Sequence, residues 1–449
     1  MKRKIFIYFG LAVIFLRVQS QPVSIAEAEQ VARHFFGKTH KSLQNCVSIS
    51  VRGEDTLLYV FNADKGFVVV SGEKKAIPIL AYSTESNYDA EHVIPPVKMW
   101  MDNYQRQLFA LRQDATQQQS ISISKAWKEL QTFPKTHKST TSPATPLITS
   151  KWGQGKMYNY YCPKDEESNN NNNNNNKRAV TGCVATTMAQ LMYYFRYPEK
   201  GTGTYLYTHD VYGAISADFE DALYDYSAMV ETPDRINPAI SLLMSHCGIA
   251  VDMQYGPVSS GMYNHKAAYA LKTYFNFSPQ TQYVFRDSTS LDWDSLIVAH
   301  LDNKIPLYYA GWSVPNIEGH AFICDAYQMD SNNGNHYYYY HFNFGWDGYL
   351  DGYFFTDTLS PNGNNFNLAQ ELIVNAFPDT LKLPYPLQPP LTGTTTLTAE
   401  AGSFTDGTIY DCPPNMNYTW IIQPDVDRIT KIQFSLRYNL EKGDTLFVT

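Results

Sequence analysis

Residues 181–195, TGCVATTMAQLMYYF, place the strongest limit on how this chain can fold. Their apolar side chains recur at steps of three and four residues, at Val184, Met188, Leu191, Met192 and Phe195. This spacing predicts a helix that buries one face in a hydrophobic core. Cys183 stands at the start of that helix, where its thiol would lie at the positive end of the helix dipole, beside backbone N–H groups that have no helical partner.

Three interpretations of Cys183 are open. Cysteine is among the most often buried residue types, so the thiol could be a core side chain or the disulfide partner of Cys162. It could also be a nucleophile, because a helix N-terminus lowers the pKa of a thiol and favours the reactive thiolate. Thr181 and Gly182 would leave space for a carbonyl substrate. The six cysteines are too sparse for a disulfide-built scaffold, and without a C-x-x-C pair they predict no structural zinc site.

Length and charge limit the class of protein. A chain of 449 residues is expected to contain about two to four domains. The formal net charge of −8 and the absence of a dense Lys/Arg block argue against a nucleic-acid partner. At the N-terminus, Lys2, Arg3 and Lys4 precede an apolar run, 5–16, that is shorter than the roughly 20 residues of a membrane-spanning helix. This pattern predicts a signal peptide that ends near Ser20, and hence a secreted protein with no membrane span.

Composition and patterning divide the chain into five parts. They are a signal peptide at 1–20, a first folded unit at 21–145, a unit rich in Tyr, Trp and Gly at 146–378, a proline-bearing linker at 379–395, and a β-rich unit at 396–449. The first two folded units are each expected to mix helices and strands.

The first unit carries clear local signals. Helical spacing in SIAEAEQVARHFF predicts a helix with Ser24 as its N-cap, and a further helix is expected over 97–111. Strand-like runs at 57–61 and 67–70 are separated by turn residues.

The last unit alternates apolar and polar residues over 432–438 and resumes that pattern at Leu446 and Val448. Period-two alternation is typical of half-buried strands. The pattern reaches Thr449 without a turn signal, so we expect a β-sandwich-like module that is cut short and a chain that is a fragment of a longer protein.

Two further residues fit chemistry at Cys183. His320 follows it by 137 residues (320 − 183), within the roughly 130–150 that separate nucleophile and base in papain-type enzymes. Gln154 could donate, together with the Cys183 N–H, to the oxyanion that forms when a thiolate attacks an amide. Asp325 is badly placed to orient His320, because residues five apart on a strand point to opposite faces. Asn343 is another candidate for that role.

Four motifs together resemble the streptopain family of secreted bacterial cysteine peptidases. In chain order they are TGCVATTMAQLMYYFRYP, GIAVDMQYGPVSSG, GHAFICDAY and NFGWDGYLDGYF. The resemblance covers most of residues 147–378. The first unit resembles the inhibitory propeptide of that family, with GFVVVSGEKKAIPILAYS as its best match. The third unit resembles the start of a CUB-like domain, through GSFTDGTIYDCPPNMNYTWIIQP.

The resemblance implies an α+β, papain-like peptidase domain with a Cys183–His320 dyad and an oxyanion-hole glutamine at Gln154. Asn343 remains a candidate orienter of the histidine. The aromatic turn of the family usually reads Asn-Trp-Gly-Trp, whereas Phe344 stands second here. Phe344 can pack against the imidazole, but it has no indole N–H.

Family likeness also implies residues that line the substrate cleft. Trp346 would wall the cleft, and Gly256 and Gly319 would border it. The segment 251–261 would border the pocket for an apolar side chain two residues before the scissile bond. Its alternative interpretation is a simple turn between a helix and a strand.

The function expected from these features is that of a secreted cysteine endopeptidase made as an inactive precursor. Its partners would be protein or peptide substrates and its own propeptide, at 21–145, and it would need neither a metal nor an organic cofactor. One alternative is a secreted binding or adhesion protein that keeps the scaffold without turnover. Another is a thiol amidase or acyltransferase, which would share the chemistry and differ in the acceptor.

Overall fold

The computed structural model describes most of the chain. The described residues are 22–37, 43–44, 46–49, 56–114, 118–132, 145–167, 177–286, 289, 291–312, 319–332, 335–359, 369–381, 392–397 and 417–423. The expected signal peptide at 1–20 and the strand pattern from 432 onward lie outside these residues. Within the described ranges, no helix is long and apolar enough to cross a membrane.

The N-terminal unit packs helices against antiparallel strands, as expected. Its elements are α1 (Ile25–Phe36), β1 (Cys46–Ile49), β2 (Leu58–Asn62), β3 (Phe67–Ser71), β4 (Ile79–Ser83), α2 (Pro95–Gln113) and α3 (Ile121–Thr132). The helix predicted after Ser24 is confirmed. Ser24 Oγ accepts a hydrogen bond from the Glu27 N–H (3.3 Å), and the Glu27 carboxylate accepts one from the Ser24 N–H (3.1 Å). This capping box fixes the start of α1.

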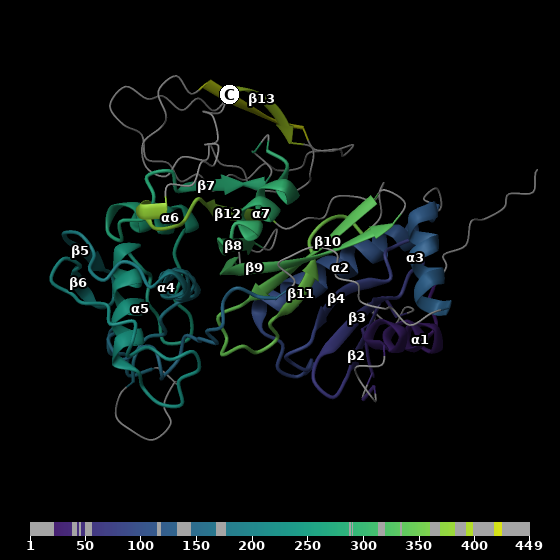
Figure 1. Cartoon of the computed structure of the whole chain (residues 1–449), viewed down its shortest axis with the longest axis horizontal. Coiled ribbons are helices and arrows are strands. Elements are labelled where there is room, and N and C mark those ends of the chain that lie inside the picture. The colour runs from purple at the N-terminus through teal and green to yellow at the C-terminus, as the bar shows by residue number, and fades with distance from the viewer. Residues whose placement is uncertain are drawn as a thin grey trace, which may run out of the picture.

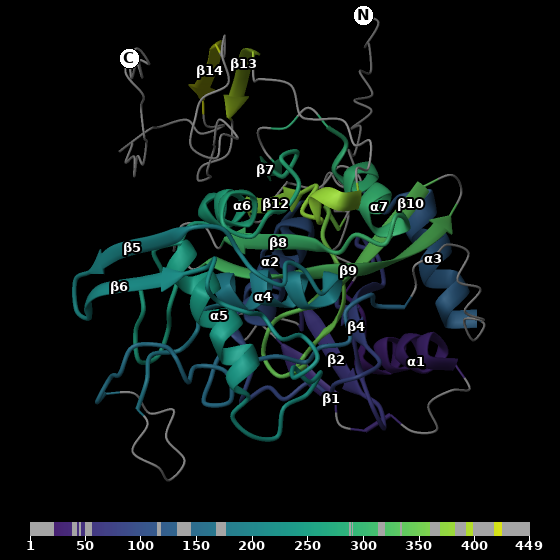
Figure 2. The same ribbon diagram turned by 60° about the vertical axis from the view of Figure 1, so that its left-hand side comes forward.

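Among its described residues, the middle unit has four α-helices and most of the remaining strands. Its helices are α4 (Cys183–Phe195), α5 (Pro238–Ala250), α6 (Asn264–Thr273) and α7 (Trp293–Asp302). Its strands are β5 (Thr204–His209), β6 (Gly213–Asp218), β7 (Gln282–Phe285), β8 (Leu307–Trp312), β9 (Gly319–Asn332), β10 (Asn335–Asn343), β11 (Gly352–Phe355) and β12 (Ala369–Val374). Strands β5 and β6 form a separate hairpin that projects from the body of the protein (Figure 2).

One sheet runs through both units. Its strand order is β1-β2-β3-β4-β11-β10-β9-β8-β12-β7. The units join where β4 pairs with β11 in antiparallel register, with Tyr82 opposite Tyr353 and Ala81 opposite Phe354. In Figure 1 the N-terminal unit, with its strands of this sheet, forms the right-hand part of the molecule, and helices α4, α5 and α6 lie at the left. The N-terminal unit is therefore bonded to the middle unit through the backbone as well as through side chains.

The two faces of the sheet belong to different hydrophobic cores. Along β9, Ala321 and Ile323 pack in the core of α4, α5 and α6, whereas Phe322 and Cys324 pack in the core that includes α2 and α7. This division follows from the alternation of side chains along a strand. The indole of Trp100 in α2 stacks on Phe342 in β10 (ring centroids 5.9 Å apart, planes at 8°), so α2 contributes to the core of the middle unit.

Beyond the large sheet, the structure describes a short 3-10 helix, η3 (Asp379–Leu381), and a parallel pair of strands, β13 (Thr392–Leu397) and β14 (Asn417–Ile422). Strand β13 begins inside the stretch that was expected to be a linker, 379–395. Strand β14 contains Trp420. The resemblance to a CUB-like domain stays a prediction, because most of its residues lie outside the described part of the chain.

Candidate active site

Helix α4 begins at Cys183 because of the glycine before it. Gly182 is the N-cap, with φ +87°, a conformation that residues with a side chain rarely adopt. A Cβ at this position would lie 2.8 Å from the Ser260 carbonyl oxygen and 2.9 Å from the Met253 sulfur. No side chain caps the helix, so its first N–H groups remain free to act on the thiol.

The Cys183 thiol is free and partly buried, and it is hydrogen-bonded to His320. Burial alone would raise the pKa of the thiol. The charge of His320, the hydrogen bond to it, and the backbone N–H groups of Ala321 and Val184 outweigh burial and lower the pKa of Cys183 below its ordinary value. Two of the three interpretations of Cys183 are thereby weakened, since the thiol is neither a fully buried core residue nor part of a disulfide.

His320 lies near the start of β9, opposite Gly311 of β8. Burial lowers the pKa of His320, but the negative charge of a Cys183 thiolate, the hydrogen bond to it and the Phe344 carbonyl together raise the pKa of His320 above its ordinary value. The raised pKa of His320 and the lowered pKa of Cys183 both favour a thiolate–imidazolium pair. Helix α4 and strand β9 thus bring together two residues that the sequence places 137 apart.

A main-chain carbonyl holds the far side of the imidazole. His320 Nε2 lies 3.0 Å from the Phe344 carbonyl oxygen, which can only accept, so Nε2 carries a hydrogen and Nδ1 is left for the thiol. The indole of Trp346 lies against the same ring, with centroids 5.2 Å apart. The Phe344 ring itself packs among Phe322, Phe342 and Phe354 in the buried core. The contact of Phe344 with the imidazole is therefore made by its backbone.

Gln154 carries an unused hydrogen-bond donor. Its side-chain Nε2 is buried and has no hydrogen-bond partner. Buried polar groups in proteins are almost always paired, so an unpaired amide of this kind needs an explanation. The backbone fixes the residue beside the thiol, because the Thr181 N–H donates to the Gln154 carbonyl oxygen at 3.1 Å. A donor kept free for a transient oxyanion would have these properties.

Asn343 is close to the site, but its side chain hydrogen-bonds to groups other than His320. Its Nδ2 donates to the Ser150 carbonyl (2.8 Å), and its Oδ1 accepts from Gln190 Nε2 (3.2 Å) and from the Gly345 N–H (3.2 Å). The Gly345 N–H and the Phe344 carbonyl belong to one peptide group. Asn343 therefore bears on the histidine through that peptide group.

The segment expected to border the cleft is bonded to the residues just before the thiol. The Val180 N–H donates to the Gly256 carbonyl (3.1 Å), and Ser260 Oγ donates to the Val180 carbonyl (2.8 Å). Gly319 begins β9, directly before the histidine, and Trp346 is partly exposed beside the imidazole. Their role in lining a substrate cleft stays a prediction.

Sequence reasoning missed several polar residues behind the site. Asp325 does not contact His320; it pairs with His341 Nδ1 at 2.6 Å, and both side chains are buried. Gln190 and Asp351 are fully buried and hydrogen-bonded to the turn that follows β10. A glutamine within an apolar helical run was the available signal for Gln190. Asp351 lies in the NFGWDGYLDGYF motif, and nothing in the sequence distinguishes it from the other residues of that motif. The described residues contain no group of His, Cys, Asp and Glu side chains arranged to hold a metal.

Comparison with known proteins agrees with this geometry. Residues 152–354 match the peptidase C10 family, and residues 20–108 match the Spi protease inhibitor family. Apart from residue 20, the second match falls within the unit predicted to be a propeptide, 21–145.

Individual relatives support the same assignment. Streptopain of Streptococcus pyogenes is 31% identical over 352 residues, which cover 72% of this chain and 81% of streptopain. The thiol protease/hemagglutinin PrtT of Porphyromonas gingivalis is 26% identical over 411 residues, which cover 85% of this chain but only 45% of PrtT. The solved structure of a prointerpain A fragment from Prevotella intermedia matches with a TM-score of 0.55 and 29% identity, over 75% of this chain and 99% of that one. The chain belongs to the peptidase C10 family of streptopain-like cysteine peptidases and carries an N-terminal inhibitor domain of the Spi type.

Proposed function

We propose that this protein is the precursor of a secreted cysteine endopeptidase in which Cys183 is the nucleophile and His320 is the acid and base. The observation that carries the proposal is the hydrogen-bonded pair of Cys183, with its lowered pKa, and His320, with its raised pKa. The buried, unpartnered amide of Gln154 supports its assignment as the oxyanion donor. Secretion is supported by the N-terminal basic and apolar pattern.

The reaction follows from the resting thiolate and imidazolium. The Cys183 sulfur bonds to the carbonyl carbon of the scissile peptide, and the C=O electron pair moves to oxygen, which accepts hydrogen bonds from Gln154 Nε2 and the Cys183 N–H. His320 gives its proton to the amine as the C–N bond breaks, and a thioester remains. Neutral His320 then takes a proton from water, whose oxygen attacks the thioester, and the Cys183 thiolate leaves. The imidazolium–thiolate pair is thereby restored.

The N-terminal unit is positioned to restrain this site. The Met99 methyl of α2 lies 3.2 Å from where a Cβ on Gly311 would stand, and Gly311 is the register partner of His320. Trp100, the next residue of α2, is fully buried against Phe342. The propeptide thus packs against the strands that carry the histidine, which supports a role in holding the precursor inactive.

The test is a Cys183→Ala substitution in the full chain. We expect loss of casein hydrolysis and of self-processing near residue 145, without loss of the folded structure. The matched control is Cys247→Ala, since Cys247 is a free cysteine in the core of the same unit and its pKa is raised above the ordinary range by burial. That variant should lose some stability and keep hydrolysis. Hydrolysis retained by Cys183→Ala would exclude this mechanism, and absence of hydrolysis in the unaltered, processed chain would favour a binding protein on the same scaffold.

A further inference from the structure

The peptide group between Phe344 and Gly345 is the part of the molecule that orients His320. Its carbonyl accepts from His320 Nε2, and its N–H donates to Asn343 Oδ1. The direction of that carbonyl depends on the backbone on either side of it. Gly345 has φ +71°, and a Cβ there would lie 3.1 Å from Thr186 Cγ2 of the thiol helix, so the turn has little freedom after the carbonyl.

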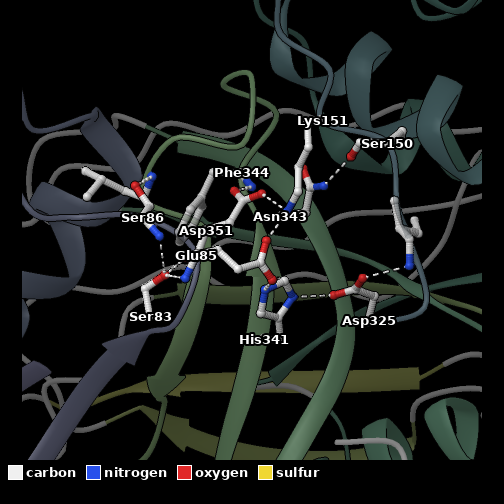
Figure 3. A network of polar contacts seen from close by, with 12 residues as sticks. Ser83, Glu85, Ser86, Ser150, Lys151, Asp325, His341, Asn343, Phe344 and Asp351 are labelled. Atoms are coloured by element: carbon white, nitrogen blue, oxygen red, sulfur yellow. Dashed lines mark hydrogen bonds and ion pairs between the residues drawn. The ribbon is translucent and has the colours of Figure 1, made fainter. Parts of the chain in front are cut away.

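Asp351 holds the same turn on the N-terminal side of the Phe344 carbonyl. Its Oδ1 accepts a hydrogen bond from the Phe344 N–H at 2.9 Å, and this bond spans seven residues to close the turn (Figure 3). The Asp351 side chain is fully buried, and its other oxygen lies 3.3 Å from Lys151 Nζ. A buried carboxylate is costly unless it is paired and hydrogen-bonded, and Asp351 meets both conditions at this one place.

We propose that Asp351 is a positioning residue for the catalytic histidine: it holds the Phe344 main chain so that the Phe344 carbonyl aims the His320 imidazole at the Cys183 sulfur. Asp351 touches neither substrate nor sulfur, and it acts through the backbone alone. Lys151 supports this role by neutralising the carboxylate.

The expected effect of Asp351 on the rate of hydrolysis rests on the proposed function. Its effect on the orientation of His320 does not. If the Phe344 carbonyl moved, His320 would lose its fixed orientation, and the Cys183 thiolate would lose its main stabilising charge. Misplacement of a catalytic group by about 1 Å can cost on the order of 10²-fold in rate. Because burial alone raises the pKa of Cys183, a loosened histidine would also move thiolate formation to higher pH.

The experiment compares Asp351→Ala with Asp351→Asn in the full chain. Asparagine keeps an oxygen that can accept from the Phe344 N–H, whereas alanine removes it. The first readout is the rate at which iodoacetamide labels Cys183, measured by peptide-resolved mass spectrometry from pH 5 to pH 10. We expect the Asp351→Ala profile to move toward the ordinary thiol range near pH 8.5 to 9, and the Asp351→Asn profile to stay close to that of the unaltered chain.

The second readout is hydrolysis of fluorescein-labelled casein by the processed proteins. We expect kcat to fall on the order of 10²-fold in Asp351→Ala with KM nearly unchanged, and to recover to within several-fold in Asp351→Asn. The matched control is Asp325→Asn, which alters another fully buried carboxylate that pairs with His341. It should lower the melting temperature and leave the labelling profile of Cys183 in place.

If Asp351→Ala does not fold, Asp351→Ser is used in its place. The serine hydroxyl is one bond closer to the backbone than the aspartate oxygen and is too short to reach the Phe344 N–H. A folded Asp351→Ala or Asp351→Ser protein with the unaltered labelling profile and kcat would overturn the proposal, as would an Asp351→Asn protein shifted as far as the alanine variant. Failure of the unaltered chain to hydrolyse casein would instead count against the proposed function, and the labelling profile would still decide the role of Asp351.

Discussion

Burial and charge act on the Cys183 thiol in opposite directions, and the outcome depends on single neighbours. Burial is the largest influence and raises the pKa of the thiol, while His320 is the largest influence that lowers it. A cysteine at a helix N-terminus without that neighbour would be an ordinary buried thiol, as Cys247 is. At the scale of residues, the reactivity of the Cys183 thiol therefore depends on its pairing with His320.

Gln154 allows the oxyanion role to be tested separately from that pair. We predict that Gln154→Ala lowers kcat for casein hydrolysis about 10²- to 10³-fold with little change in KM, because the lost donor acts only when negative charge develops on the substrate oxygen. Gln154→Glu should be at least as damaging, since a carboxylate of the same shape would repel that charge.

The control for Gln154 is Lys156→Ala, an exposed position in the same loop, which should stay within about twofold of the unaltered enzyme. Labelling of Cys183 by iodoacetamide should be unchanged in Gln154→Ala, because the thiolate does not depend on the amide. A Gln154→Ala enzyme with normal kcat would remove Gln154 from the mechanism.

At the scale of elements, the turn that follows β4 connects the propeptide to the Asp351 region. Ser83 Oγ donates to the Asp351 carbonyl (2.5 Å), the Leu350 N–H donates to Ser86 Oγ (3.0 Å), and Glu85 pairs with Lys151 (2.6 Å), as Figure 3 shows. The propeptide therefore binds the same short segment that holds the Phe344 backbone.

We predict that Glu85→Gln, made in the Cys183→Ala precursor to prevent processing, lowers the melting temperature by about 1 °C at pH 7. The side chain of Glu85 is 35% exposed, so solvent screening limits its ion pair with Lys151 to about 0.5 kcal/mol. Burial raises the pKa of Glu85, but its hydrogen bond to Lys151 and the charge of Lys151 lower that pKa below the ordinary value of 4.5. The stabilisation is thus complete above about pH 4.5 and is lost as pH falls through the lowered pKa.

The same reasoning predicts that the precursors with and without Glu85→Gln have the same melting temperature once the pH is well below the pKa of free glutamate. Glu129→Gln is the control, because its pairing with Lys125 is long (3.7 Å) and exposed, and it should change nothing at either pH. Equal melting temperatures at pH 7, or a difference that persists undiminished at pH 3, would contradict the assigned role of Glu85.

Single elements were predictable from the sequence where local chemistry decides them. The Ser24 cap, the helix of the thiol and the strands at 57–61 and 67–70 follow from capping and periodicity, and all are present. Helix α3 was not expected, and its apolar positions are few, with Ile123, Trp127 and Leu130 buried. Its place is decided by packing on the rest of the unit, which local patterns do not reveal.

At the scale of the whole molecule, one sheet carries both the propeptide and the peptidase strands. Pairing of β4 with β11 continues the backbone ladder from one unit into the other. Departure of the propeptide would turn β11 into an edge strand and expose part of the core that Trp100 fills. Removal of the N-terminal unit would therefore require loss of strand pairing and of buried apolar surface, and cleavage of a linker alone would not separate the units.

The sequence predicted which residues form the site but could not supply the contacts between them. Cys183 and His320 were found from residue type, spacing and resemblance, and Gln154 from its chemistry. The peptide group that receives His320, and the aspartate behind it, depend on the path of the backbone after β10. Asn343 was a candidate orienter of the histidine. Its Oδ1 accepts from the Gly345 N–H, and the carbonyl of the same peptide group, that of Phe344, accepts from His320.

The most direct test of the whole account is the pH dependence of iodoacetamide labelling at Cys183, compared between the unaltered chain and His320→Ala. With the pair intact, labelling should proceed well below pH 8. Without the imidazole, burial should move labelling above pH 9, since it raises the pKa of the thiol. Identical profiles in the two proteins would show that His320 does not stabilise the thiolate and would contradict the central claim.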